Sequence, residues 1–377
     1  ARIPKEVQPF PSWARLRTPP VGGPNAAADA AFVAGASLAR LDQILRCSGA
    51  DLSCAGKDSG DVSSVGKSGG GGGDEPVFAG ALRHRLALRA GAACAALARL
   101  REDEGALRDA QHLAGVDAAL SPGARLHRLW RLFATRPTRF DARVLRVAAD
   151  CLDLPPDIDC AALIAAAHET RGETPLAAAT RVSAETLRVL NDASPIDAEI
   201  FALWLADLVL AQQLRWDAPL PLLATMIVHP SVRNASSGGA SNSAADVSSG
   251  ARNIRAEASG GASNSHAALG RRPRPGDADW SLSVMRAYAR AAQETYALAG
   301  ELSRRAETLL RAAPKLRAKK ATRVVDLLLA DDCVSASRAA KTAGLSDRAA
   351  RRLFDRLSEL GAVRELTGRA NFRLYGL

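Results

Sequence analysis

The sequence predicts an all-α, multi-helix body followed by a small C-terminal domain in which helices are combined with a short β-hairpin. Three observations predict this fold class. Hydrophobic residues make up 47% of the 377-residue chain but aromatic residues only 4%, because alanine supplies much of the apolar content. Segments rich in Ala and Leu, with few β-branched runs, favour helices over strands. The net charge is +10, and most of it lies near the C-terminus.

Low-complexity segments divide the chain. Residues 1–24 are rich in proline and predict an irregular N-terminal arm, whereas apolar residues at helical spacing predict a helix over 25–46. Residues 47–75 are rich in Gly and Ser and predict a flexible loop inside a helical body that we expect over 25–228. Residues 229–279 repeat Gly, Ser and Asn, so they bury too little apolar area to offset the entropy of ordering, and we interpret them as a linker or insertion.

Prolines indicate where several helices of the body begin. Three of them follow a Ser or Thr that can cap the helix: Ser121-Pro122, Thr174-Pro175 and Ser194-Pro195. Proline suits the first helical position because the N–H that it lacks would be unpaired there in any case. Residues 196–214 carry three acidic side chains and predict a central core helix instead of a membrane span. Residues 280–314 predict one long helix, which either returns to the body or acts as a dimerisation strut.

Residues 315–377 carry most of the positive charge. They hold 14 Lys or Arg against 7 Asp or Glu and so contribute +7 of the total +10. Charge concentrated in one segment is typical of a surface that binds phosphate groups. Apolar spacing predicts three helices here, over 321–330, 335–343 and 347–360, with a tight turn at 344–346 between the last two.

A β-hairpin is expected after the third helix. Gly361 is placed to adopt the left-handed backbone that ends a helix. Residues 362–366 and 371–375 predict two short strands, joined by a turn at Thr367-Gly368. Three helices followed by a hairpin are the order of elements of a winged helix-turn-helix domain, in which the hairpin is the wing.

The third helix separates an apolar face from a basic face. The residues expected to face the core are Ala350, Leu353, Phe354, Leu357 and Leu360. Arg348, Arg351 and Arg352 project from the opposite side, in the N-terminal half of the helix. A recognition helix in a major groove presents its N-terminal residues to base edges and phosphates, so this polarity predicts DNA binding.

We expect the C-terminal domain to bind double-stranded DNA. Arg369 would lie at the tip of the wing, and Arg364 and Arg373 along its strands, where a wing contacts backbone phosphates. The full set of candidate nucleic-acid-binding residues is Lys319, Lys320, Arg348, Arg351, Arg352, Arg356, Arg364, Arg369 and Arg373. The alternative is that the winged helix docks a protein or mediates dimerisation, since such domains also serve those roles.

The sequence contains no motif of a catalytic site: no nucleophile elbow, no H-E-x-x-H zinc motif and no dinucleotide fingerprint. Residues 66–68, Gly-Lys-Ser, resemble the end of a phosphate-binding loop. The spacing from the preceding glycine is wrong, however, and a glycine run follows where a helix would begin. We therefore expect no enzymatic activity, no metal and no cofactor.

The densest charged cluster of the body spans residues 101–112 and is the one region where an enzyme site would be sought. Glu104 and Arg108 are four residues apart, which favours an ion pair on one helix face. Asp109 and His112 share a face at a spacing of three, yet no second histidine is placed nearby to complete a metal-ligand motif. We interpret the cluster as a solvated helix face or a structural ion-pair network.

Six cysteines are spread along the chain without a C-x-x-C pair. Cys94 and Cys151 lie in apolar helical stretches and are expected to be small buried side chains, while Cys47 and Cys54 could meet in a loop. The N-terminal residues lack the apolar segment of a secretory signal, and no stretch is apolar enough to cross a membrane. We expect a reduced, cytoplasmic protein without a membrane partner.

Three segments of the sequence, residues 78–88, 101–110 and 361–377, resemble an uncharacterised bacterial family. The chain is similar to domain of unknown function family 1403, found on alphaproteobacterial chromosomes and plasmids. The resemblance covers most of the chain except the two low-complexity stretches, which look like insertions relative to the family pattern. It implies an all-helical protein with a C-terminal winged helix and brings no known activity or site.

The sequence as a whole predicts a DNA-binding protein, regulatory or replicon-associated, whose helical body dimerises or binds a partner. The alternative is a helical scaffold or complex subunit whose winged helix docks protein.

Overall fold

The structure is a computed structural model that describes residues 25–46, 75–113, 119–139, 141–233, 272–316, 320–369 and 372–377. These residues are mostly helical, and one small antiparallel sheet lies at the C-terminal end. The expectation of a mostly helical chain with a small C-terminal β-structure is confirmed. The expectations for residues 1–24, for Cys47, Cys54 and Lys319, and for most of the two low-complexity stretches lie outside the described residues.

Ten helices of the described chain precede the long helix: α1 (Ala26–Arg46), α2 (Ala79–Leu97), α3 (Glu104–Leu113), α4 (Pro122–Thr135), α5 (Ala142–Asp150), α6 (Cys160–Glu169), α7 (Pro175–Val189), α8 (Pro195–Gln213), α9 (Leu223–Met226) and α10 (Pro230–Arg233). The predicted starts of α4, α7 and α8 at their prolines are confirmed. The side chains of Ser121 and Thr174 accept hydrogen bonds from the third residue of their helices, whereas Ser194 accepts none.

Helix α8 forms the centre of the body, as the sequence predicts. Every side chain from Ala198 to Ala211 is buried, including the two carboxylates Glu199 and Asp207. Glu199 pairs with Arg272 and with Arg274, whose Nε lies 3.2 Å away. Asp207 pairs with no cation of the described residues, and its oxygens accept the N–H of Leu223 at 3.0 and 3.1 Å. Burial raises the pKa of Asp207 to about 8.

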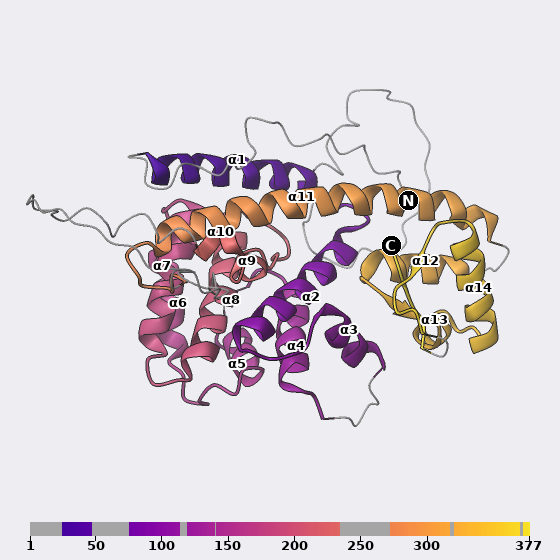
Figure 1. Cartoon of the computed structure of the whole chain (residues 1–377), viewed down its shortest axis with the longest axis horizontal. Coiled ribbons are helices and arrows are strands. Elements are labelled where there is room, and N and C mark those ends of the chain that lie inside the picture. The colour runs from indigo at the N-terminus through magenta and orange to yellow at the C-terminus, as the bar shows by residue number, and fades with distance from the viewer. Residues whose placement is uncertain are drawn as a thin grey trace, which may run out of the picture.

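Helix α11 (Trp280–Ala312) runs along the body and ends beside the C-terminal elements, with α1 alongside it (Figure 1). The Trp280 indole donates to Ser183 Oγ of α7 at 2.8 Å, and Gln293 donates to Ser37 Oγ of α1 at 3.1 Å. Of the two roles predicted for this helix, the structure shows the return to the body. A short 3₁₀ turn, Ala313–Lys315, follows α11.

The C-terminal module, residues 321–377, contains three helices and three short strands. In chain order they are α12 (Ala321–Ala330), β1 (Val334–Ser335), α13 (Ala336–Ala343), α14 (Asp347–Glu359), β2 (Arg364–Glu365) and β3 (Leu374–Gly376). The strands form an antiparallel sheet in the order β1-β3-β2. The predicted hairpin corresponds to β2 and β3. Strand β1 was not predicted, because two residues between helices are too few to show an alternating pattern.

Turns and one aromatic stack fix α14 within the module. Gly344, in the predicted turn between α13 and α14, and Gly361, after α14, have φ of 62° and 64°, the left-handed conformation that was expected at Gly361. Phe354 on the buried face of α14 stacks on Tyr375 of β3, with ring centroids 4.2 Å apart and planes 5° from parallel. The exposed face of α14 is therefore held in a defined orientation relative to the sheet.

The module packs directly on the body. A Cβ atom added to Gly80 of α2 would lie 2.6 Å from the carbonyl oxygen of Ala330, so α2 and α12 approach one another closely where glycine permits it. Nearby, Arg131 of α4 pairs with Asp331 and Asp332, which follow α12. We call this contact region the junction.

Candidate nucleic-acid interface

Helix α14 presents its predicted faces to the core and to solvent. Ala350, Leu353, Phe354 and Leu357 are buried, and Leu360 is half-buried. Arg348, Arg351 and Arg352 are exposed, and none of them forms an ion pair with a residue that the structure describes. The Ser346 hydroxyl caps the helix by accepting the N–H of Ala349 at 3.2 Å. Three unpaired guanidinium groups thus project from one side of the N-terminal half of α14.

A groove with a volume of about 730 Å³ lies between α14, the wing and the body. Its lining residues are His112, Ser335, Ala336, Ser337, Asp347, Arg351, Asp355, Phe372, Arg373 and Tyr375. The structure thereby brings the predicted residues Arg351 and Arg373 together. It also places Asp347 and Asp355 in the same groove, where their negative charge reduces the attraction for phosphate.

Other predicted residues already have partners within the chain. Arg356 pairs with Glu359 at 2.9 Å on the exposed surface of α14. The Lys320 ammonium donates to the carbonyl oxygen of Gly344 at 2.6 Å and so supports the turn before α14. Both side chains are exposed, and such surface contacts exchange readily with other partners because each contributes little free energy.

The arginine expected at the wing tip, Arg369, has an ion-pair partner in the body. Arg369 pairs with Asp109 of α3 at 2.6 Å, although more than half of the arginine side chain remains exposed. Asp109 is 15% exposed, and a carboxylate so largely removed from water is stabilised by a cation. The wing therefore lies against the body. The turn that carries it is closed by Glu365, whose carboxylate accepts N–H groups of Thr367 and Gly368.

Arg364 has different neighbours from Arg373, although both lie on the predicted wing. Burial and the nearby cations Arg305 and Arg85 lower the pKa of Arg364, which places its guanidinium beside α11 and α2. Arg373 instead borders the groove with Arg351. The candidate residues consequently include an α14 group joined by Arg373, and a wing arginine, Arg369, that is paired with the body.

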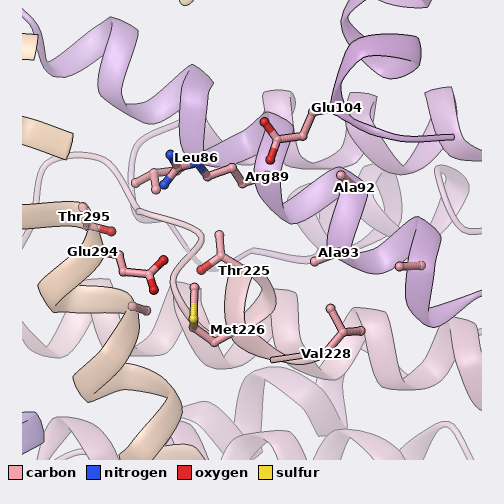
Figure 2. A pocket seen from close by; sticks show the side chains of 12 residues that line it. Leu86, Arg89, Ala92, Ala93, Glu104, Thr225, Met226, Val228, Glu294 and Thr295 are labelled. Carbon is pink, nitrogen blue, oxygen red and sulfur yellow. The ribbon is translucent and has the colours of Figure 1, made fainter. Parts of the chain in front are cut away.

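The predicted charged cluster at 101–112 does not form one site. Arg108 lies 3.7 Å from Asp109, and the expected pair between Glu104 and Arg108 is not formed. Glu104 instead borders a separate hollow of about 470 Å³ between α2, α9 and α11. Figure 2 shows this hollow with Arg89 and Glu104 on the α2 side and Glu294 pointing inward from α11. Glu294 also pairs with Arg290 at 2.6 Å.

The buried polar cluster at the junction was not predicted from the sequence. Arg131 is 15% exposed and contacts Asp331 at 3.1 Å and Asp332 at 3.3 Å, and Arg338 also pairs with Asp331. Burial and the adjacent Asp331 carboxylate raise the pKa of Asp332 to about 7. Burial opposes ionisation of Asp331 as well, but its hydrogen bond with Asp332 and the charge of Arg131 hold the pKa of Asp331 well below its usual range.

Histidines from three helices line the same region. Burial lowers the pKa of His84 and of His112 to about 4, and that of His127 to about 3, so all three are neutral near pH 7. Cys333, directly after the two aspartates, is a buried free thiol. The one available signal was an Asp-Asp-Cys sequence directly after an apolar helix, where adjacent charges are unusual.

The described residues contain no helix that is both long and apolar enough to cross a membrane.

The fold defines the class of the protein: a mostly helical chain that ends in a small antiparallel sheet and an arginine-bearing helix. The chain belongs to the family described as Protein of unknown function (DUF1403), whose profile matches residues 73–264 and 254–377. The resemblance stated for residues 78–88, 101–110 and 361–377 is thus confirmed. The first low-complexity stretch lies almost wholly outside the match, whereas the second falls within it. No functionally curated protein matches the chain.

Proposed function

We propose that the C-terminal module is a winged helix-turn-helix domain and that the chain is a cytoplasmic DNA-binding protein, regulatory or replicon-associated. The order of elements supports the first part: helix, strand, helix, helix and two strands, with the sheet order β1-β3-β2. In this arrangement α13 and the turn at Gly344 support α14 as the recognition helix.

The observation that carries the proposal is the group of three exposed, unpaired arginines on α14. Arg348, Arg351 and Arg352 lie opposite the buried face that anchors the helix. Arg131, by contrast, is held by two carboxylates at the junction. Guanidinium groups that are free of internal partners are available to phosphate oxygens and to guanine edges.

The structure suggests how the rest of the module contributes. Arg373 lies in the groove with Arg351, so the two extend one basic surface from α14 to the wing. Arg369 joins this surface only when its ion pair with Asp109 opens. The helical body then serves for dimerisation or for binding a partner.

The test is binding to duplex DNA between about 50 and about 200 mM salt, because each phosphate contact contributes about −0.9 to the slope of log affinity against log salt. The decisive variant is Arg348→Glu/Arg351→Glu/Arg352→Glu. Its matched control is Arg143→Glu/Arg146→Glu/Arg171→Glu, which makes the same change in net charge on exposed body positions.

We expect a steep slope for the unmodified protein, a loss of about 100-fold or more in affinity for the α14 variant, and little change for the control. Circular dichroism verifies that both variants fold. An affinity for DNA that does not change with salt, or equal binding by the two variants, would contradict the proposal.

The second candidate function is a helical scaffold or complex subunit whose module docks a protein. The observation that favours it is the mixed lining of the groove, where Phe372 is 60% exposed beside Asp347 and Asp355. An exposed aromatic side chain with both signs of charge suits a protein surface better than a phosphate backbone. A partner that remains bound after nuclease treatment and high salt, and is lost in Phe372→Ser, would favour this function.

A further inference from the structure

The junction brings together three side chains of types that bind metal ions. His112 comes from α3 of the body, and Asp332 and Cys333 come from the segment between α12 and β1. One imidazole nitrogen, one carboxylate oxygen and the thiol sulfur all lie within 4.8 Å of one another. We propose that His112, Asp332 and Cys333 form a binding site for a divalent transition-metal ion of the zinc type.

The donor set specifies the class of ion. Nitrogen and sulfur donors select zinc and similar ions, whereas magnesium and calcium prefer a shell composed of oxygen. In a tetrahedral zinc site with bonds of about 2.0–2.3 Å, neighbouring ligand atoms are roughly 3.4–3.8 Å apart. A separation below 4.8 Å is therefore closed by small side-chain rotations without movement of the helices.

A second observation points to a ligand at this place. His112 Nε2 is buried and has no hydrogen-bond partner among the described residues, and Cys333 is a fully buried free thiol. A buried imidazole nitrogen without a partner is destabilising, because it has lost the hydrogen bond that water would provide. A metal ion would satisfy that nitrogen.

The charges around the cluster permit a cation. Asp331 is the main partner of both Arg131 and Arg338, so it offsets one of their two positive charges. Arg131 contacts Asp332 as well, through Asp332 Oδ1 at 3.3 Å. An Asp332 carboxylate and a Cys333 thiolate would together neutralise a divalent ion, as protein ligands do in zinc sites.

The site also has an entry path and an open position. His112 borders the groove of about 730 Å³, so an ion would approach the buried Asp332 and Cys333 from the His112 side. Three protein ligands leave the fourth tetrahedral position to water or to an exogenous group. Because His112 belongs to the body and Cys333 to the C-terminal module, the bound ion would join the two parts. This inference does not depend on DNA binding.

The test uses the full chain, freed of metal with a chelator and titrated with cobalt(II) as a spectroscopic substitute for zinc. We expect one cobalt ion per chain with tetrahedral d–d bands and a thiolate-to-cobalt charge-transfer band, and displacement of the cobalt by zinc. Zinc should also raise the thermal unfolding midpoint, because it binds the folded chain only.

The ligand variants separate the roles of the three side chains. Cys333→Ser should abolish the charge-transfer band, whereas Asp332→Asn and His112→Gln should retain it with affinity lowered by about 100-fold. The matched controls Cys151→Ser and His168→Gln change the same residue types elsewhere in the body and should bind as the unmodified chain does.

Two outcomes would overturn the site. One is the absence of a thiolate band with excess cobalt. The other is an unchanged band in Cys333→Ser, which would assign the metal to other cysteines. Should Asp332→Asn fail to fold, the His112→Gln variant decides, because His112 is only partly buried and forms no hydrogen bond with a described residue.

Discussion

Helix α14 and the junction use arginine in opposite ways. On α14, Arg348, Arg351 and Arg352 are exposed and unpaired among the described residues. At the junction, Arg131 is 15% exposed and held by two carboxylates that are each 3% exposed. An arginine in the first setting can be replaced with little effect on folding and is available to a partner. An arginine in the second setting stabilises buried acids and has no capacity left for a ligand.

The largest effect expected from this difference is on stability. Arg131→Met leaves Asp331 and Asp332 buried without their main cation, which should lower the free energy of unfolding by about 3–5 kcal/mol. Arg352→Met on α14 should change it by less than about 0.5 kcal/mol. Denaturant unfolding of the two variants measures both changes in unfolding free energy. Similar values would contradict the proposed difference between Arg131 and Arg352.

Buried carboxylates sharpen the same contrast, because Glu199 has two arginine partners and Asp207 has none in the part of the chain that the structure describes. The pKa of Asp207 is about 8 in the folded chain against a usual value of 3.8, so its contribution to stability is complete below pH 3.8 and is lost as the pH rises toward 8. The unmodified chain should therefore lose on the order of 1 kcal/mol of unfolding free energy per pH unit in this range, and Asp207→Asn should not show this loss.

Unfolding free energies of Asp207→Asn and the unmodified chain, measured from about pH 4 to about pH 8, check this expectation. The unfolding free energy of the variant should increase relative to that of the unmodified chain as the pH rises. Parallel pH profiles would show that Asp207 is ionised in the folded protein.

The contact between body and module rests on sterics as well as charge. Gly80→Ala places a Cβ atom 2.6 Å from the Ala330 carbonyl oxygen, so α12 must shift, at a cost of about 1–3 kcal/mol in unfolding free energy. Gly35→Ala is the control, because no atom lies within 4 Å of its added Cβ and alanine favours a helix by about 0.5–1 kcal/mol. Thermal unfolding should move in opposite directions for the two variants.

The smallest expected effect concerns the wing. Asp109→Asn releases Arg369, which would add up to one phosphate contact and steepen the salt slope of DNA binding by about 0.9. Glu301→Gln removes the same charge from the Arg305 pair on α11 and should leave the slope unchanged. Equal slopes for these two variants would show that Arg369 takes no part in binding.

Local features of the fold could be predicted, because contiguous residues encode them. A Ser or Thr followed by proline located three helix starts, and apolar spacing predicted the buried face of α14. Gly361 adopts the left-handed backbone expected from its position after a helix, and Gly344 lies in the turn predicted at 344–346. Each of these features needs only residues within about two helical turns of one another.

The junction and the state of the wing could not be predicted, because their partners are remote in the sequence. Arg131 and Asp331, and likewise Asp109 and Arg369, are separated by some two hundred residues or more and meet only when the module packs on the body. No second histidine lies near His112 in the sequence to complete a metal-ligand motif. The structure places Asp332 and Cys333 there instead.

Helix α11 has a mechanical consequence. Its 33 residues form a single rod about 50 Å long that starts in the body and ends beside the module. A tilt of about 10° about the middle of α11, where Gln293 donates to Ser37 of α1, would displace each end by about 4 Å. A small change in the packing of α1 against α11 would thus move the end of α11 that lies beside the C-terminal module.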